Sequence, residues 1–110
     1  MNIEKKENYT LLSSEENSFS DMFSEFKSAI VDLEKEHIIL HISDSINIAT
    51  KDFSLFLDIA VTKKANKTSF VIVNATINID YLSEEINVTP TLQEAEDILE
   101  MEAIERELGY

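Results

Sequence analysis

The fold of this chain is decided by the stretch His37-Ile-Ile-Leu-His-Ile42, in which apolar residues follow one another without alternation. Strands with this pattern are buried on both faces, as in parallel sheets that helices cover. The stretch Ser69-Phe-Val-Ile-Val73 repeats it, and shorter β-prone segments lie at residues 8–12 and 86–88. We therefore expect a sheet of four strands, with residues 8–12 at one edge.

Two amphipathic helices are expected between these strands. The first has Ser18 as its N-cap and Asp21 three residues later, its apolar positions keep the 3.6-residue period as far as Leu33, and residues 35–36 close it. The second begins at Thr50 as N-cap and ends among lysines, where positive charge suits a helix C-terminus. Its apolar side is formed by Phe53, Phe56, Leu57, Ala60 and Val61, and the closing lysines are Lys63, Lys64 and Lys67.

The sequence indicates where the last helix begins and where it ends. Thr91 is its predicted N-cap, with Glu94 completing a capping box, and Gly109, the single glycine of the chain, falls where a left-handed residue ends a helix. Its surface carries many carboxylates: Glu94, Glu96, Asp97, Glu100, Glu102, Glu105 and Glu107. Its apolar positions are expected to cover the sheet: Leu92, Ala95, Ile98, Leu99, Met101, Ile104 and Leu108.

The elements follow one another as β-α-β-α-β-turn-β-α. The turn is expected as one helical turn at Asp80–Glu85, with Tyr81 and Leu82 packing inward. Strands alternating with helices imply a mostly parallel sheet with right-handed crossovers. We therefore predict an α/β fold, with one small domain over residues 1–110, a four-stranded mostly parallel sheet and three main helices on one or both of its faces.

The composition excludes several classes of function and assigns none. The net charge of −13 and the pI near 4.3 argue against binding to nucleic acid or to an anionic membrane, since both need basic residues. The chain has no cysteine, no apolar run of membrane-spanning length and no signal-peptide pattern at its start. We expect a cytoplasmic protein whose partner is another protein.

Motifs of catalysis are missing from the sequence. His37 and His41 are the only histidines, and in a strand this spacing separates them by about 13 Å, too far for a shared metal. A single glycine leaves no room for a nucleophile elbow, a phosphate-binding loop or a dinucleotide fingerprint. Most glutamates of the last helix are expected on a solvated face. We expect no catalytic residue, metal or cofactor.

The connection between the central strand and the second helix is the candidate partner-binding site. It lies where α/β domains bind ligands, beyond the carboxyl end of a strand. Ser45 and Thr50 are candidate phosphoacceptors, because a phosphate at a helix N-terminus is stabilised by free backbone N–H groups. The alternative for Thr50 is a plain N-cap. The candidate partner-binding residues are Asp44, Ser45, Asn47, Thr50, Lys51 and Asp52.

From residue 37 to residue 105 the chain resembles the anti-sigma-factor-antagonist, or STAS, family. The likeness lies in the strand 38–43 and the loop after it, the helix from Thr50, the strand 70–73 and the run Val88-Thr-Pro-Thr-Leu-Gln-Glu-Ala95. STAS proteins typically carry Asp-Ser-Ser-Gly at the start of the second helix, where a partner kinase phosphorylates one serine.

In this chain Ala49-Thr-Lys-Asp52 stands in place of that motif. Lys51 then occupies the usual phosphoserine position, and Thr50 inherits the role only by a one-position shift. The resemblance therefore implies a STAS-like domain that lacks the standard phosphoserine switch. Such a module is expected to be no enzyme and to act on a regulatory kinase or another sigma-regulatory protein.

The final segment is also similar to that of small bacterial proteins labelled ribonuclease Z. That nuclease processes tRNA 3′ ends through histidine-rich zinc motifs, whereas this chain has two histidines and neither motif. The similarity implies, as an alternative, an accessory protein linked to the nuclease. Zinc-dependent RNA processing by the chain itself, and nucleic-acid mimicry by the carboxylate-rich helix, are two further alternatives.

Overall fold

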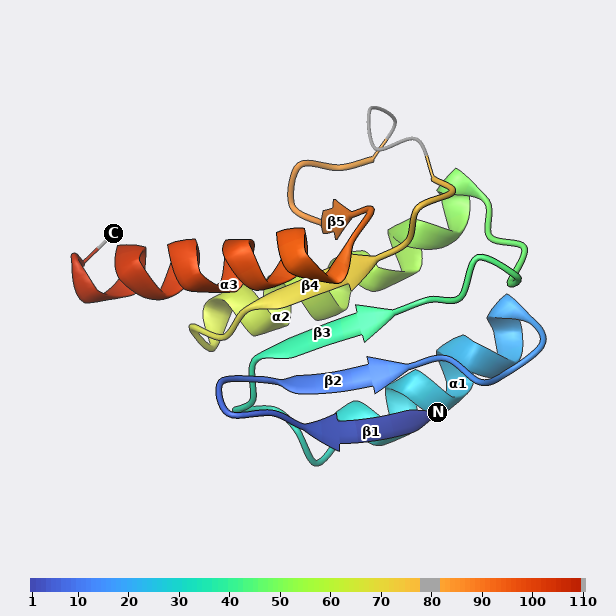
Figure 1. Cartoon of the computed structure of the whole chain (residues 1–110), viewed down its shortest axis with the longest axis horizontal. Helices are drawn as coiled ribbons and strands as arrows, with labels where there is room; N and C mark the ends of the chain where they lie inside the picture. The colour runs from blue at the N-terminus through green and yellow to red at the C-terminus, as the bar shows by residue number, and fades with distance from the viewer. Residues whose placement is uncertain (78–81, 110) are drawn as a thin grey trace.

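The computed structural model describes residues 1–77 and 82–109, and in them one mixed sheet of five strands lies at the centre of the molecule (Figure 1). Neighbouring strands pair in chain order. The first pair is antiparallel and the other three are parallel. The strands are β1 (Asn2–Lys5), β2 (Thr10–Ser13), β3 (Ile38–His41), β4 (Phe70–Val73) and β5 (Asn87–Thr89).

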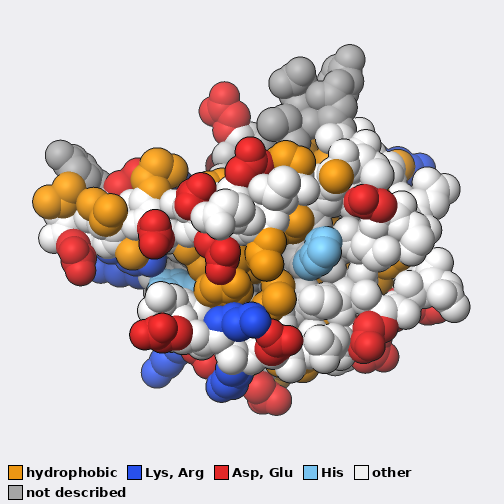
Figure 2. Space-filling view, in the orientation of Figure 1, with side chains coloured by type: hydrophobic (Ala, Val, Ile, Leu, Met, Phe, Trp, Pro, Cys, Tyr) orange, Lys and Arg blue, Asp and Glu red, His pale blue; other side chains and the backbone are white. Residues whose placement is uncertain are grey.

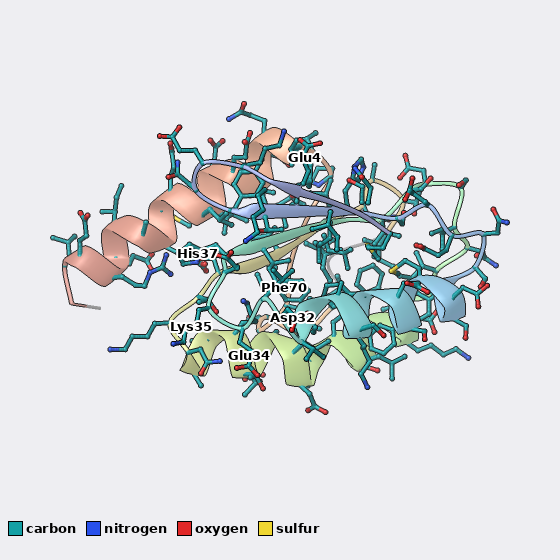
Figure 3. All side chains as sticks on the ribbon, turned by 90° about the horizontal axis from the view of Figure 1, so that it is seen from below. Glu4, Asp32, Glu34, Lys35, His37 and Phe70 are labelled. Atoms are coloured by element: carbon teal, nitrogen blue, oxygen red, sulfur yellow. The ribbon has the colours of Figure 1, made fainter. Side chains whose placement is uncertain are left out.

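Three α-helices and a 3₁₀-helix lie on the two faces of this sheet in the described residues. On one face lie α1 (Phe19–Ile30) and the 3₁₀-helix η1 (Thr50–Phe56), which runs on into α2 (Leu57–Ala65). On the other face α3 (Leu92–Glu107) packs against β4 and β5, and the edge-on view shows it across the sheet from α1 and α2 (Figure 3). The predicted α/β class with three main helices is confirmed.

The continuous apolar runs of β3 and β4 are buried because successive residues serve different layers. Leu40 and Ile72 belong to the core shared with α1, η1 and α2. In this core the rings of Phe26, Phe56 and Phe70 pack against one another. Phe56 also contacts the rings of Phe19, Phe23 and Phe53. Ile39 and Val71 belong to the core beneath α3. The sheet therefore separates two apolar layers, as parallel strands buried on both faces require.

The predicted strand count was wrong because β1 was missed. All four residues of β1 are exposed, so it carries no apolar pattern, and it is held by its antiparallel ladder to β2. A turn closed by a 2.8 Å bond from the Lys6 N–H to the Tyr9 carbonyl joins the two strands. The strand predicted at residues 8–12 consequently lies inside the sheet, between β1 and β3.

The N-caps of the first and last helices are confirmed, whereas among the described residues the Glu94 carboxylate does not return the bond to Thr91 that a capping box requires. The hydroxyl of Ser18 accepts the N–H of Asp21, and that of Thr91 accepts the N–H of Glu94, each at 3.2 Å. Gly109 adopts a φ of +81° and its N–H donates to the Arg106 carbonyl. This left-handed conformation is one that glycine adopts without the steric cost of a Cβ.

Thr50 is the first residue of η1 and not its N-cap. Ala49 holds the N-cap position, and the carboxylate of Asp52 accepts the Ala49 N–H at 2.9 Å. Val61, predicted on the apolar side, is 49% exposed. These differences share a cause: a 3₁₀ start turns the following helix relative to the 3.6-residue pattern that the prediction assumed.

Three further predictions about helices and turns change. The first helix ends at Ile30, five residues short of the predicted end, because Leu33 turns back into the core. Met101 and Ile104 of α3, and Leu108 directly after it, are more than half exposed and do not cover the sheet. Residues 82–85 contain a bend and a turn and no helix, and Leu82 packs against the larger core as predicted; Asp80 and Tyr81 lie outside the described residues.

Within residues 1–77 and 82–109, no helix combines the length and the apolar character needed to cross a membrane.

Candidate functional site

The connection 44–52 lies beyond the carboxyl end of β3, as predicted. Because β2, β3 and β4 are parallel and in register, Ser13, His41 and Val73 end side by side. Ser14 and Asn74 directly follow β2 and β4, and Ser43 comes two residues after His41, so the three meet at one edge of the sheet. Polar groups from three chain segments are brought together there, in the place where α/β domains bind ligands.

Hydrogen bonds tie the first half of the connection to both neighbouring strands. The Ser43 N–H donates to the Ser14 hydroxyl, and the hydroxyls of Ser43 and Ser45 share a bond, both at 2.8 Å. On the other side, the carboxylate of Asp44 accepts the Ala75 N–H at 3.4 Å. The chain path after β3 is thus held from two directions while Ser45 stays exposed.

Asn74 is the central member of this polar group. It is only 2% exposed, and its amide donates to the Ile42 carbonyl at 3.3 Å. Its side-chain oxygen accepts the N–H and the hydroxyl of Thr76, at 3.0 and 2.7 Å. The sequence prediction missed Asn74. Its position directly after the apolar run of β4 is the signal that could have found it.

The second half of the connection is anchored by apolar burial. Ile46 is 2% exposed and belongs to the larger core, so the residues on either side of it are turned outward. Asn47 and Lys51 are exposed, and the Lys51 carbonyl accepts the Ser54 hydroxyl at 2.7 Å. An apolar side chain, that of Leu55, is 51% exposed one helical turn beyond Lys51.

The two predicted phosphoacceptors occupy unlike positions. Ser45 is exposed and its hydroxyl is engaged with Ser43. Thr50 is half-buried, and the N–H at the N-cap position beside it is already taken by Asp52. A phosphate on Thr50 would meet that carboxylate two residues away, and like charges repel. Of the six predicted residues, Thr50 and Asp52 therefore shape the helix start, and the others face outward.

A second polar group lies at the opposite, amino-terminal end of the strands, beside α3. The Nδ1 atom of His37 accepts the Ser69 N–H at 3.0 Å, and Arg106 donates to the Ser69 hydroxyl at 3.2 Å. Burial, together with the positive charges of Arg106 and Lys63, lowers the pKa of His37 below its ordinary 6.5. His41 lies at the other end of β3 and is exposed.

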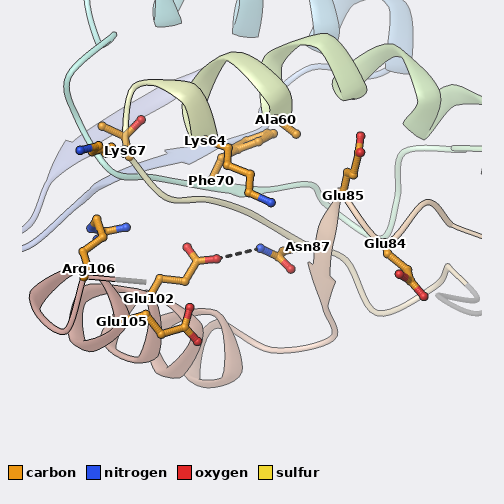
Figure 4. A pocket seen from close by; sticks show the side chains of 12 residues that line it. Ala60, Lys64, Lys67, Phe70, Glu84, Glu85, Asn87, Glu102, Glu105 and Arg106 are labelled. Carbon is orange, nitrogen blue, oxygen red and sulfur yellow. Dashed lines mark hydrogen bonds between the residues drawn. The ribbon is translucent and has the colours of Figure 1, made fainter.

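A cleft of about 520 Å³ separates α2 from α3 at this end (Figure 4). Lys64, Lys67 and Arg106 line it together with glutamates, and Glu102 accepts the amide of Asn87 at 3.4 Å. Charges of both signs thus face the same cleft. In the part of the chain that the structure describes, no three histidine, aspartate or glutamate side chains are grouped as metal ligands.

No protein-family profile matches the chain, and no curated protein shows significant similarity to it.

Proposed function

We propose that this protein is a non-catalytic, STAS-like interaction module that regulates or scaffolds another protein. Its docking surface, here called the loop surface, consists of residues 44–52 and the exposed side of η1. One observation carries the proposal. The loop is fastened by Ser43 and Asp44 to the segments that follow β2 and β4, and by Ile46 to the core, yet Ser45, Asn47 and Lys51 remain exposed on it.

A fastened loop suits recognition because little conformational entropy is lost when a partner binds it. The loop surface also combines unlike chemistries. Asn47 offers an amide, Lys51 offers a cation, and Leu55 offers exposed apolar area one turn further along η1. An apolar contact beside hydrogen-bonding groups is the usual composition of a protein interface.

The STAS resemblance supports the same surface. The stretch that aligns with the phosphorylated motif of that family is Ala49–Asp52, at the start of η1. Lys51 at the phosphoserine position, and Asp52 on the neighbouring N–H, favour docking without the standard switch. We infer a regulatory kinase, another sigma-regulatory protein or a nuclease as the class of partner.

The experiment is site-specific photo-crosslinking followed by binding to the purified partner. A photoreactive residue is placed at Asn47, and a control is placed at Glu25, an exposed position on α1. The crosslinked protein is identified and purified, and its affinity is measured for Lys51→Ala and Leu55→Ala. We expect each substitution to weaken binding about tenfold, as central interface contacts do.

The chain offers a matched control pair. Lys27 and Val31 also stand four residues apart with exposed side chains, at the end of α1. Lys27→Ala and Val31→Ala should leave the affinity unchanged. If the partner binds all four variants alike, or crosslinks equally from Asn47 and Glu25, the loop surface is not where it docks.

A further inference from the structure

A groove of about 740 Å³ runs between α3 and the turn that joins β1 to β2. It lies at the amino-terminal ends of the strands, away from the loop surface. Tyr9 of the turn donates its hydroxyl to the Glu96 carboxylate of α3 at 2.8 Å. This bond joins residues 87 positions apart in the sequence and holds the two walls together, so the groove is formed before anything binds in it.

The groove has an apolar wall. Leu99, Ala103 and Ile104 of α3 line it, and Tyr9 lines it from the turn, packed against the same small core as Leu99. Ile104 is 57% exposed because α3 continues beyond the ends of the strands at this point (Figure 1). The space-filling view shows apolar side chains gathered at this free end of the helix (Figure 2). Burying Ile104 would therefore be favourable for a partner that offers apolar surface.

The rim of the groove is acidic. Glu96, Asp97 and Glu100 line it from α3, where Figure 2 shows carboxylates above the hollow. Arg106 lies at one end, with its guanidinium engaged by Ser69. Asp97 and Glu100 are exposed, so each can pair with a basic side chain of an arriving chain. Complementary charge of this kind selects the partner and speeds its encounter.

A second copy of this chain fits the groove poorly. Residues 92–107 hold seven carboxylates and one arginine, and the whole chain has a net charge of −13. Two copies meeting at α3 would place like charges opposite one another, which disfavours an interface. The charge of the groove therefore selects a basic occupant.

We propose that this groove binds a basic segment of another protein. One aliphatic or aromatic side chain of the segment packs against Leu99, Ala103 and Ile104, while flanking lysine or arginine side chains pair with Asp97 and Glu100. The proposal does not depend on the loop surface, which lies at the other end of the strands. Either surface can fail its test while the other passes.

The test uses the full chain and a fluorescein-labelled amphipathic peptide of lysine and leucine, followed by fluorescence anisotropy at low salt. Ile104→Gln removes apolar area without changing charge, and Asp97→Asn combined with Glu100→Gln removes two rim charges. We expect each variant to bind the peptide about tenfold more weakly. The double variant should also show a flatter dependence on salt, since fewer ion pairs remain to be screened.

Controls on the same helix separate the groove from a general effect of α3. Met101→Gln changes an apolar side chain of similar exposure that does not line the groove. Glu105→Gln combined with Glu107→Gln removes two charges outside the groove. Both controls should bind as the parent does, and a peptide with alanine in place of leucine should bind about tenfold more weakly to the parent.

Three results would overturn the proposal. The control double variant could weaken binding as much as the rim double variant, which would show that net charge, and not the groove, determines binding. Peptide-induced NMR shifts could fall on residues 44–52 and not on Tyr9 and Ala103. Sedimentation could show a dimer that Ile104→Gln dissociates, which would make a second copy the occupant.

Discussion

Replacing Lys63 with methionine is expected to lower the free energy of unfolding by about 2 kcal/mol, a large effect for a lysine. Lys63 is 5% exposed, although lysine is a residue seldom found buried and this one belongs to the lysine-rich end of α2. Its ammonium donates to three backbone carbonyls, those of Leu33 at 3.2 Å, Glu34 at 3.4 Å and Glu36. The Lys63 side chain thus holds the backbone of the segment between α1 and β3 in place.

The magnitude follows from which carbonyls water can reach. Methionine keeps the stem of the side chain but donates nothing. The bonds to Glu34 and Glu36 are only partly buried, so water can replace them, whereas the bond to Leu33 is buried. A buried acceptor left without a donor costs about 1–3 kcal/mol. Burial also lowers the pKa of Lys63, and removing the charge recovers part of that desolvation cost, which places the net loss near the middle of the range.

Urea denaturation followed by circular dichroism at neutral pH measures the change. For a chain of 110 residues, 2 kcal/mol corresponds to a fall in Tm of about 8 °C. The control is Lys64→Met at the next position, which is exposed and should change stability by less than about 0.5 kcal/mol. The reasoning is refuted if Lys63→Met is as stable as the parent, or if Lys64→Met loses as much.

Three other substitutions probe the remaining polar contacts. Asn74→Ala should lower the free energy of unfolding by about 2 kcal/mol and speed hydrogen exchange at the Thr76 amide, because the Ile42 carbonyl and the Thr76 N–H each lose a buried partner. Unchanged exchange at Thr76 would contradict this prediction. The lowered pKa of His37 gives stability that is full above its unfolded value of about 6.5 and is lost as pH falls through the folded value. His37→Asn should therefore lose less stability than the parent between pH 7 and pH 5, and an equal loss would exclude His37 as the cause. Burial and the Glu96 carboxylate raise the pKa of Tyr9 to about 12. Its contribution is present below pH 10 and is lost as pH rises through about 12, so Tyr9→Phe should abolish that alkaline step in an unfolding titration.

The sequence predicted those elements whose causes lie within a few residues. The apolar runs of β3 and β4, and the caps at Ser18 and Thr91, are local patterns, and the structure has them where expected. β1 has no such pattern, because an exposed edge strand is held by its neighbour's backbone. The end of α1 depends on a contact with Lys63, 30 residues from Leu33, and local periodicity carries no trace of it.

The candidate site, too, was predicted only in part. The order of elements was enough to place residues 44–52 beyond the carboxyl end of β3, and the structure agrees. Asn74 was signalled only by its position directly after the run of β4, and the sequence did not show that it meets Ser14, because both join the group through the pairing of β3 with β2 and β4. Knowledge of strand order would have supplied them, since the residue after each parallel strand lands on the same edge.

The end of α3 is exposed because the helix is longer than the strands that it covers. Strands of four residues extend about 13 Å, whereas a helix of 16 residues extends about 24 Å. Once Ala95 and Leu99 are buried on β4, the rest of the helix must continue past the sheet. Ile104 and Leu108 then have no strand to cover, although their spacing is that of a sheet-covering helix. The apolar stripe is thus longer than the sheet beneath it, and this length, with the acidic rim beside it, is what makes the groove suited to the basic segment proposed above.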